Sequence, residues 1–334
     1  MKSDKYESFL KEIENNRENE STFNLNDRVL VVDGLNTFIR AFSVNPAINE
    51  DGLHVGGIIG FLKSLRYTLN FIKPSRCIIV FDGKDGSKRR RKIYPQYKET
   101  RKIKKRLNRN VDWGTAPQDE EESLKQQIGR LIEYLEHLPL TLISVDGIEA
   151  DDTMAYISQQ LLPESNIILM STDKDFLQLV DDRVKVWSPT KKKLYNKQAI
   201  LDGDKSDNIG GIKGAGLKTL KKFCPQFSSI EKFDVRDLLE FVEKSNKKIK
   251  LLENIKNSSN IIKRNYLLMQ LNKVDIPKHT MRKIQGAVNN EIPKLIKFKF
   301  QSMFLKDKLW SQIPNLDLWL QDFIDLHKYI GRDK

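Results

Sequence analysis

The sequence contains few of the residues that form disulfides or soft-metal sites. It has 2 cysteines and 4 histidines among 334 residues. Cys77 and Cys224 lie far apart and show no metal-binding or redox spacing, so we expect buried, reduced thiols in place of a disulfide. The scattered histidines give no spacing for a zinc site with cysteine and histidine ligands.

Long apolar runs are also missing. No segment approaches the roughly 18–20 apolar residues of a transmembrane helix, and residues 1–26 lack the apolar segment of a signal peptide. These residues are rich in Glu, Asn and Lys, and we expect a polar N-terminal extension. The pattern favours a cytoplasmic protein without a membrane partner.

Prolines and glycines are sparse, and positive charge exceeds negative charge. The 11 prolines, 17 glycines and 39% hydrophobic residues are typical of a globular chain. Its length exceeds the usual ~100–200 residues per domain, which favours one large α/β domain with a helical appendage, or two domains. The net charge of +13 and the pI near 9.4 indicate a polyanionic partner. Charge alone does not choose between nucleic acid and an anionic membrane.

Short apolar runs alternate with helical patterns in the first 200 residues, which predicts an α/β fold with a mostly parallel sheet covered by helices. The expected strands lie in 28–34, 76–83, 140–147, 166–171 and 184–189, and the expected helices in 35–42, 56–72, 119–137 and 148–162. Glycine punctuation and basic helical patterns follow. We therefore expect the polar extension (1–26), an α/β core (27–200) and a helical C-terminal region (201–334).

Acidic residues follow the expected strands. They are Asp33, Asp82, Glu149, Asp151, Asp152, Asp173 and Asp175. Because parallel strands end at the same edge of a sheet, these carboxylates are predicted to converge there. Asp204 and Asp207 add a pair at the i, i+3 spacing of one helical turn.

The acidic residues have a structural and a chemical interpretation. Each one alone suits a helix N-cap or a turn. Together they would repel one another without cations, and Mg²⁺ combines carboxylates with water and phosphate oxygens. The cluster therefore predicts a metal site for phosphoryl chemistry, with metal-activated water as the nucleophile.

A basic stretch follows Asp82. Residues 88–106 contain eleven Lys or Arg residues and one acid, Glu99. A solvated surface is the plain interpretation of such a run. Its place at the mouth of the acidic cluster favours phosphate binding instead, and Tyr94 and Tyr97 could stack on bases.

A glycine-rich hairpin is expected at residues 211–216, GIKGAG, between two helical segments. A plain turn between helices is one interpretation. Its position after the last acidic pair favours a grip on a nucleic-acid backbone, because glycines allow backbone amides to approach a phosphate. Lys218, Lys221 and Lys222 would place positive charge on the following helix.

Six motifs, in order, resemble those of the flap endonuclease superfamily of structure-specific 5′ nucleases, which includes the 5′ nuclease domain of bacterial DNA polymerase I. They are VVDGLNTFIRAF, IIVFDG, YPQYKETR, GIEADD, STDKDFLQLV and GDKSDNIGGIKGAG. The resemblance covers residues 28–225. Within the superfamily the chain looks most similar to the T-even-type bacteriophage ribonuclease H group.

The resemblance implies a role for each matching residue. The tighter metal site would use Asp33, Asp82, Glu149, Asp151 and Asp152, and the second site Asp173, Asp175, Asp204 and Asp207. Lys98, Arg101 and one of Arg89 to Arg91, with Arg89 as the choice, would act on the scissile phosphate. DNA would be contacted by Arg40, Arg90, Arg91, Tyr94, Tyr97, Gly211, Gly214, Gly216, Lys218, Lys221 and Lys222. Ile39 stands where relatives often carry a tyrosine before the arginine that Arg40 matches.

The resemblance further implies a PIN-like nuclease core, a helical arch at 88–122 and a helix-hairpin-helix-like motif that binds K⁺ in some relatives. The expected activity is 5′ to 3′ exonuclease, flap endonuclease and ribonuclease H cleavage with two Mg²⁺ ions, for which Mn²⁺ could substitute. The expected partners are DNA with a 5′ flap, nick or RNA primer and a single-strand-binding or other replication protein, and the expected state is a monomer. A non-catalytic duplex-binding scaffold and a PIN-like single-strand ribonuclease are the alternatives.

Overall fold

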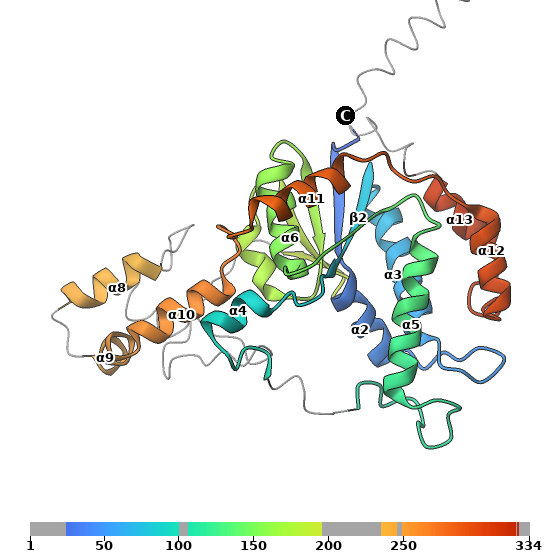
Figure 1. The fold of residues 1–334 in the computed structure, drawn as a ribbon, viewed down its shortest axis with the longest axis horizontal. Helices are drawn as coiled ribbons and strands as arrows, with labels where there is room; N and C mark the ends of the chain where they lie inside the picture. Colours follow the sequence, from blue (N-terminus) through green and yellow to red (C-terminus); the bar gives the residue numbers. More distant parts are fainter. Residues whose placement is uncertain (1–24, 100–105, 196–234, 246–248, 325, 327–334) are drawn as a thin grey trace, which may run out of the picture.

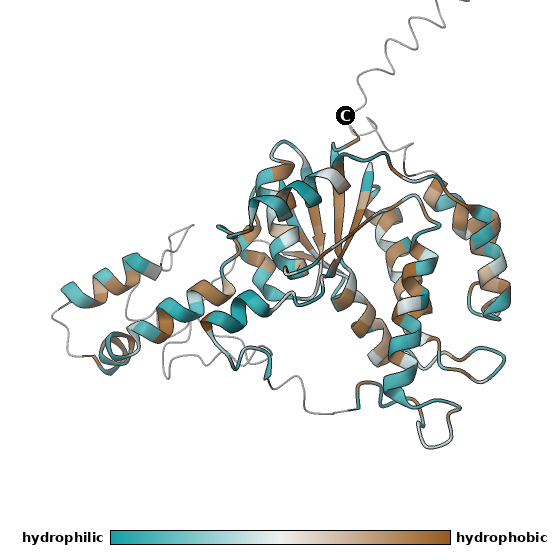
Figure 2. Ribbon diagram, in the orientation of Figure 1, coloured by the Kyte–Doolittle hydropathy of each residue, from teal (hydrophilic) through white to brown (hydrophobic). Residues whose placement is uncertain are grey.

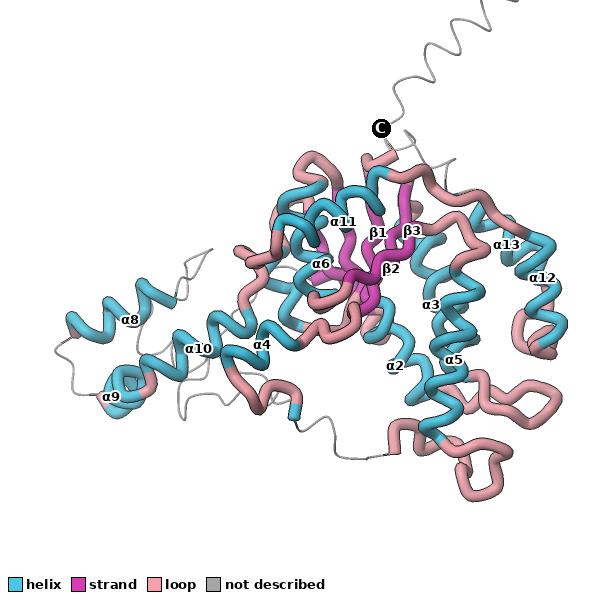
Figure 3. The backbone as a smooth tube through the Cα atoms, in the orientation of Figure 1, coloured by secondary structure: helices cyan, strands magenta, loops and turns pink. Residues whose placement is uncertain are grey.

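A six-stranded sheet forms the centre of the molecule, with the strand order β3-β2-β1-β4-β5-β6 (Figure 3). The computed structural model describes residues 25–99, 106–195, 235–245, 249–324 and 326. The strands are β1 (Arg28–Asp33), β2 (Arg76–Asp82), β3 (Thr141–Val145), β4 (Asn166–Met170), β5 (Val184–Ser188) and β6 (Lys193–Tyr195). Strands β1 to β5 are parallel, which confirms the expected fold class. The short antiparallel edge strand β6 was not predicted.

Strand β1 lies between β2 and β4 and is covered on both faces. Its residues Val29, Leu30, Val31 and Val32 are fully buried, as expected for a continuous apolar run in a parallel sheet. Leu30 and Val32 belong to the core on one face, and Val29 and Val31 to the core on the other. The chain passes from β1 to β2 and β3 on one side and then returns to β4 on the other side of β1. The ends of β1 and β4 are therefore a topological switch point, the place where open α/β sheets bind ligands.

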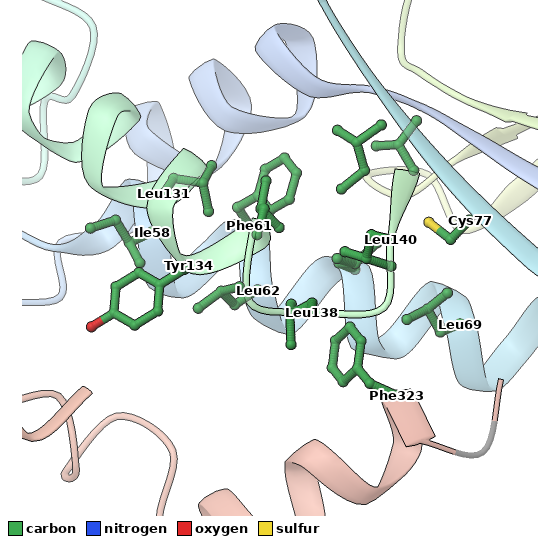
Figure 4. Close-up of a cluster of buried hydrophobic side chains, with 14 of the residues drawn as sticks. Ile58, Phe61, Leu62, Leu69, Cys77, Leu131, Tyr134, Leu138, Leu140 and Phe323 are labelled. Carbon is green, nitrogen blue, oxygen red and sulfur yellow. The ribbon is translucent and has the colours of Figure 1, made fainter. Parts of the chain in front are cut away.

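Helices from both ends of the described chain cover the face lined by Leu30 and Val32. They are α2 (Gly34–Val44), α3 (Gly56–Ile72), α5 (Glu120–Leu135), α12 (Lys297–Lys306) and α13 (Leu316–Ile324). In this core Phe61 of α3, Tyr134 of α5 and Phe323 of α13 are buried together (Figure 4). The C-terminal helices therefore complete the same core as the first strands.

The opposite face is covered by four other elements (Figure 1). They are α6 (Ala150–Tyr156), the π-helical turn η2 (Ile157–Leu161), the 3₁₀ helix η3 (Lys174–Leu179) and α11 (Lys278–Asn289). Ile284 and Val288 of α11 are buried against this face. A segment far along the chain thus closes the second side of the sheet.

A helical appendage extends away from the sheet. It consists of α8 (Val235–Lys244), α9 (Lys250–Asn257) and α10 (Ser259–Met269). Most of its buried residues form a separate cluster around Val242 and Ile255, whereas Leu268 and Met269 at the end of α10 pack with Tyr97. Figure 2 shows the strands as the most hydrophobic part of the molecule, whereas these helices have mixed character. No helix within the described ranges is long and apolar enough to span a membrane.

The basic stretch forms less helix than its pattern predicted. Helix α4 spans Lys88–Ile93 only, and Tyr94 is already extended. Pro95 explains this end, because a residue before proline is disfavoured in the helical region. Residues 106–119 are irregular, and residues 100–105 lie outside the described part of the chain. In the described part, the expected helical arch is thus a short helix followed by turns.

Phe300 provides a test of the joint core. Its ring is fully buried and lies 5.0 Å from that of Tyr134. We expect Phe300→Ala to lower the free energy of unfolding by about 3–5 kcal/mol, because it removes a buried ring and leaves a cavity. Denaturant unfolding measures the loss, and Phe298→Ala is the control because Phe298 is 79% exposed. Equal stability of the two variants would contradict a core shared by α12 and α5.

Candidate active site at the carboxyl edge of the sheet

Asp33 ends β1 and also caps the next helix. Its Oδ1 accepts a hydrogen bond from the backbone N–H of Asn36 at 3.0 Å, and its Oδ2 accepts one from the Ser171 hydroxyl at 3.1 Å. Burial, followed by the charges of Asp82 and Asp173, raises the pKa of Asp33 to about 7. The structural role as N-cap and a place in the acidic cluster therefore coexist in one side chain.

Ser171 connects Asp33 to the acids that follow β4. Its side-chain oxygen accepts from the backbone N–H of Asp173 at 3.1 Å while its hydroxyl donates to Asp33. Asp173 in turn caps η3, with its Oδ1 accepting from the backbone N–H of Asp175 at 2.9 Å. One hydroxyl thus sets the separation of carboxylates from two strands.

Asn36 makes a second link between the ends of β1 and β4. Its side-chain oxygen accepts from the hydroxyl of Thr172 at 2.8 Å and from the backbone N–H of Thr172 at 3.2 Å. Sequence analysis missed Asn36 and Ser171. Their sequence positions could have indicated them, because Asn36 lies three residues after Asp33 and Ser171 lies two residues before Asp173.

Asp82 ends β2 and connects it to α6. Its carboxylate is exposed, and Oδ1 accepts from the backbone N–H of Ala150 at 2.7 Å. Ala150 is the first residue of α6, whose N-terminal amides favour negative charge. This hydrogen bond holds the start of α6, and with it the acids beside Ala150, next to the end of β2.

Arg90 of α4 binds the acids at the start of α6. Its guanidinium pairs with Glu149, with Asp151 at 3.2 Å, and with both oxygens of Asp152 at 3.1 and 2.9 Å. Its Nε also donates to the backbone oxygen of Leu268 at 2.9 Å. Residue Arg90 is 5% exposed. Arg90 therefore lies inside the acidic cluster and not on the open surface expected of a DNA contact.

Lys98 and Tyr97 reach the same cluster from the segment after α4. The Lys98 ammonium lies 2.9 Å from Glu149 Oε1, and the Tyr97 hydroxyl donates to Glu149 Oε2 at 3.1 Å. Lys98 has a φ of 59°, a left-handed conformation that costs a non-glycine residue about 1–2 kcal/mol. The Tyr97 ring is 1% exposed, so it is not available for base stacking in this arrangement.

Opposing effects set the pKa values in this cluster. Burial, then the charge of Asp151, raises the pKa of Asp152 to about 7 against the lowering effect of Arg90. Burial and Asp151 also raise the pKa of Glu149. The pKa of Asp151 is lowered, because the charges of Arg90 and Lys98 outweigh its burial. The cluster therefore holds more negative charge than its internal cations offset.

The remaining basic candidates differ in exposure. Arg91 and Arg40 are exposed, and Arg89 is half-buried and close enough to lower the pKa of Asp152. The Tyr94 ring is half-buried under the Arg264 guanidinium, 4.3 Å from its carbon. Several predicted residues lie outside the described part of the chain, namely Arg101, Asp204, Asp207, Gly211, Gly214, Gly216, Lys218, Lys221 and Lys222.

The described carboxylates are oxygen ligands of the kind that a hard divalent ion prefers, but their positions in this structure do not form a ligand set for one ion. All the donors are oxygens, and the pKa values of Asp33 and Asp152 are raised by burial and then by neighbouring carboxylates, an effect that a bound cation would oppose. Within the described ranges, no three acidic, histidine or cysteine side chains are grouped so that they could hold one ion. Glu149, Asp151 and Asp152 instead turn their oxygens to Arg90.

A family comparison matches residues 28–203, more than half of the chain, to the 5′-3′ exonuclease N-terminal resolvase-like domain. The 5′-3′ exonuclease of Aquifex aeolicus is 29% identical over 219 residues, covering 60% of this chain and 70% of the relative. The 5′-3′ exonuclease of Bacillus subtilis is 30% identical over 233 residues, covering 62% and 73%. The thermostable DNA polymerase I of Thermus aquaticus is 31% identical over 221 residues, which cover 61% of this chain and 24% of the polymerase.

Solved structures share the fold. A crystal structure of the bacteriophage T5 flap endonuclease, in a pseudo-enzyme-product complex with DNA and metal ions, superposes with a TM-score of 0.58. The match covers 90% of this chain and 99% of that chain at 19% identity. The T5 5′-exonuclease with bound zinc gives a TM-score of 0.54 at 19% identity and the same coverage. The identities support a common fold alone.

Asp33 gives the metal-free protein a distinctive dependence on pH. Its folded pKa of about 7 lies above the ordinary 3.8, so the folded state binds more protons between these values and stability falls as pH rises through that window. We expect Asp33→Asn to remove this fall and to be more stable than wild type at pH 8, by at most about 4 kcal/mol. Urea unfolding of both proteins in EDTA at pH 5 and pH 8 measures the free energy of unfolding at each pH. Parallel pH profiles for the two proteins would contradict the buried, repelled carboxylate.

Proposed function

The chain belongs to the 5′-3′ exonuclease family, and on that premise we propose that it is a structure-specific 5′ nuclease that hydrolyses phosphodiester bonds with the help of divalent metal ions. The observation that carries the proposal is the convergence of Asp33, Asp82 and Asp173 at the ends of three adjacent strands, with Arg90 and Lys98 paired to the acids at the start of α6. Acids at a switch point of the sheet, with cations facing them, suit a phosphate substrate and its counter-ions.

Two sets of carboxylates would hold the metal ions. Asp33, Asp82, Glu149, Asp151 and Asp152 would form the first site. Asp173, Asp175, Asp204 and Asp207 would form the second site. When bound, two Mg²⁺ ions would supply a water of lowered pKa and positive charge for the reacting phosphate, and Mn²⁺ could replace them. The hydrogen bonds of Ser171 to Asp33 and Asp173 would fix the spacing between the two sites.

The basic residues would hold the phosphate. Lys98 is mostly buried, and its ammonium is already at the acidic cluster, so a short movement from Glu149 would bring it to a phosphate oxygen. Its charge would stabilise negative charge that develops in the transition state. Arg89 and Arg101 would add to this charge, and Arg40 and Arg91 would contact the nucleic-acid backbone beyond it.

The substrate we propose is DNA with a 5′ flap, a nick or an RNA primer at the 5′ end. The net charge of +13 suits a duplex partner. The 211–216 hairpin with its following lysines would grip the duplex, with K⁺ as a further ligand. We further propose that the protein has ribonuclease H activity on primers and a role in replication. It would be a monomer that acts in the cytoplasm, with a single-strand-binding protein as partner.

Cleavage of a 5′-flap duplex labelled at its 3′ end tests the function, with a matched single strand alongside, in Mg²⁺ and in EDTA. Cutting near the flap junction only with Mg²⁺ is the expected result. An RNA 5′ strand in a second duplex tests the ribonuclease H activity. Tight flap binding without cleavage would favour the scaffold, and cleavage of the bare strand alone would favour a single-strand ribonuclease.

Asp173→Asn separates catalysis from binding. Asparagine keeps the acceptor for the Asp175 amide but removes the charge, so we expect flap binding to persist and cleavage to fall by at least about 100-fold. Gel-shift and cleavage assays on the same duplex measure the two effects. The control is Asp182→Asn, because Asp182 is an exposed aspartate after η3. A fully active Asp173→Asn protein would rule out the proposed metal role of this residue.

A further inference from the structure

One guanidinium joins three parts of the molecule. Arg90 lies on α4 and donates both to the carboxylates at the start of α6 and to the Leu268 carbonyl of α10. Figure 1 shows α4 lying beside α10. Lys92 on the same helix is exposed, whereas Arg90 is buried. The position of α4 therefore depends on charge pairing that is shielded from water.

This pairing uses the same oxygens that the first metal site would need. Five of the six carboxylate oxygens of Glu149, Asp151 and Asp152 lie within hydrogen-bond distance of Arg90 or Lys98. Each inner-sphere metal contact at about 2.1 Å requires an oxygen turned toward the ion. A guanidinium and an ion of the same sign cannot share these oxygens closely without strong repulsion.

We propose that Arg90 is a built-in counter-ion that occupies the first metal position in the metal-free protein, and that a divalent ion displaces it and so frees α4 from α6 and α10. This inference rests on the proposed function, because it takes the same carboxylates as metal ligands. Two states are involved, one with Arg90 docked and one with a metal bound. Metal binding and the docking of α4 then oppose each other by the same factor in both directions.

The rival role for Arg90 makes the opposite prediction. If the guanidinium stays in place and organises the acids for the ion, removing it weakens metal binding, since three repelling carboxylates lose their alignment. If Arg90 competes with the ion, removing it strengthens binding. The sign of the change in metal affinity therefore separates a competitor from an organiser.

The experiment measures Mn²⁺ binding to the full chain without DNA, by calorimetry and by the electron paramagnetic resonance signal of free Mn²⁺. We expect Arg90→Gln to bind the first ion at least ~10-fold more tightly than wild type, within the usual range of coupling between sites. Lys92→Gln is the control, because it removes the same charge from the exposed side of α4. We expect its affinity to change by less than about 2-fold at 0.15 M salt.

Hydrogen exchange on the wild-type protein provides a second measurement that does not depend on the folding of a variant. Saturating Mg²⁺ should speed the exchange of the α4 amides. Slower or unchanged exchange in α4, or equal or weaker Mn²⁺ binding by a folded Arg90→Gln protein, would overturn the proposed competition. Absence of Mn²⁺ binding by wild type would instead overturn the proposed metal-dependent function.

Discussion

Negative charge has to be balanced at the carboxyl edge of the sheet, because three adjacent parallel strands end there and each one brings acids. Near β1 and β4 the negative charge is balanced by neutral donors, chiefly the Ser171 hydroxyl and the backbone N–H of Asn36. These donors hold Asp33 in place, but its pKa of about 7 shows that repulsion and burial are not fully offset. Near α6 the balance comes from full charges on Arg90 and Lys98. The edge is therefore well ordered and still attractive to cations.

The same requirement explains the path of the chain after β2. Asp82 ties the end of β2 to the first amide of α6, and the helix terminus there favours the acids that surround it. The segment between β2 and α5 passes this acidic end with two of its basic residues, Arg90 and Lys98, turned toward the acids. The left-handed backbone conformation of Lys98 is tolerated because it lets the ammonium group form an ion pair with Glu149. Local backbone strain at this point is offset by the ion pair it permits.

Most of the fold and part of the site could be predicted from the sequence, for a physical reason. Continuous apolar runs such as Val29–Val32 define buried parallel strands by themselves, and the acid after each run marks the sheet edge. The choice among Arg89, Arg90 and Arg91 could not be made in this way. Adjacent helical residues point about 100° apart, so the one that faces the acids depends on how α4 packs on α6 and α10. The burial of Tyr97 and the antiparallel strand β6 likewise depend on contacts distant in sequence.

The contacts of α4 also connect the helical appendage to the acidic cluster. On one side Arg90 holds Glu149 and Asp152 through charge, and on the other it holds the Leu268 carbonyl of α10. The Arg264 guanidinium over Tyr94 adds a second contact between α10 and the end of α4. Because both partners share one short helix, α10 and the acids at the start of α6 cannot be repositioned independently while Arg90 stays docked. A change in the charge of the cluster would therefore act, through Arg90, on the contact between α4 and α10.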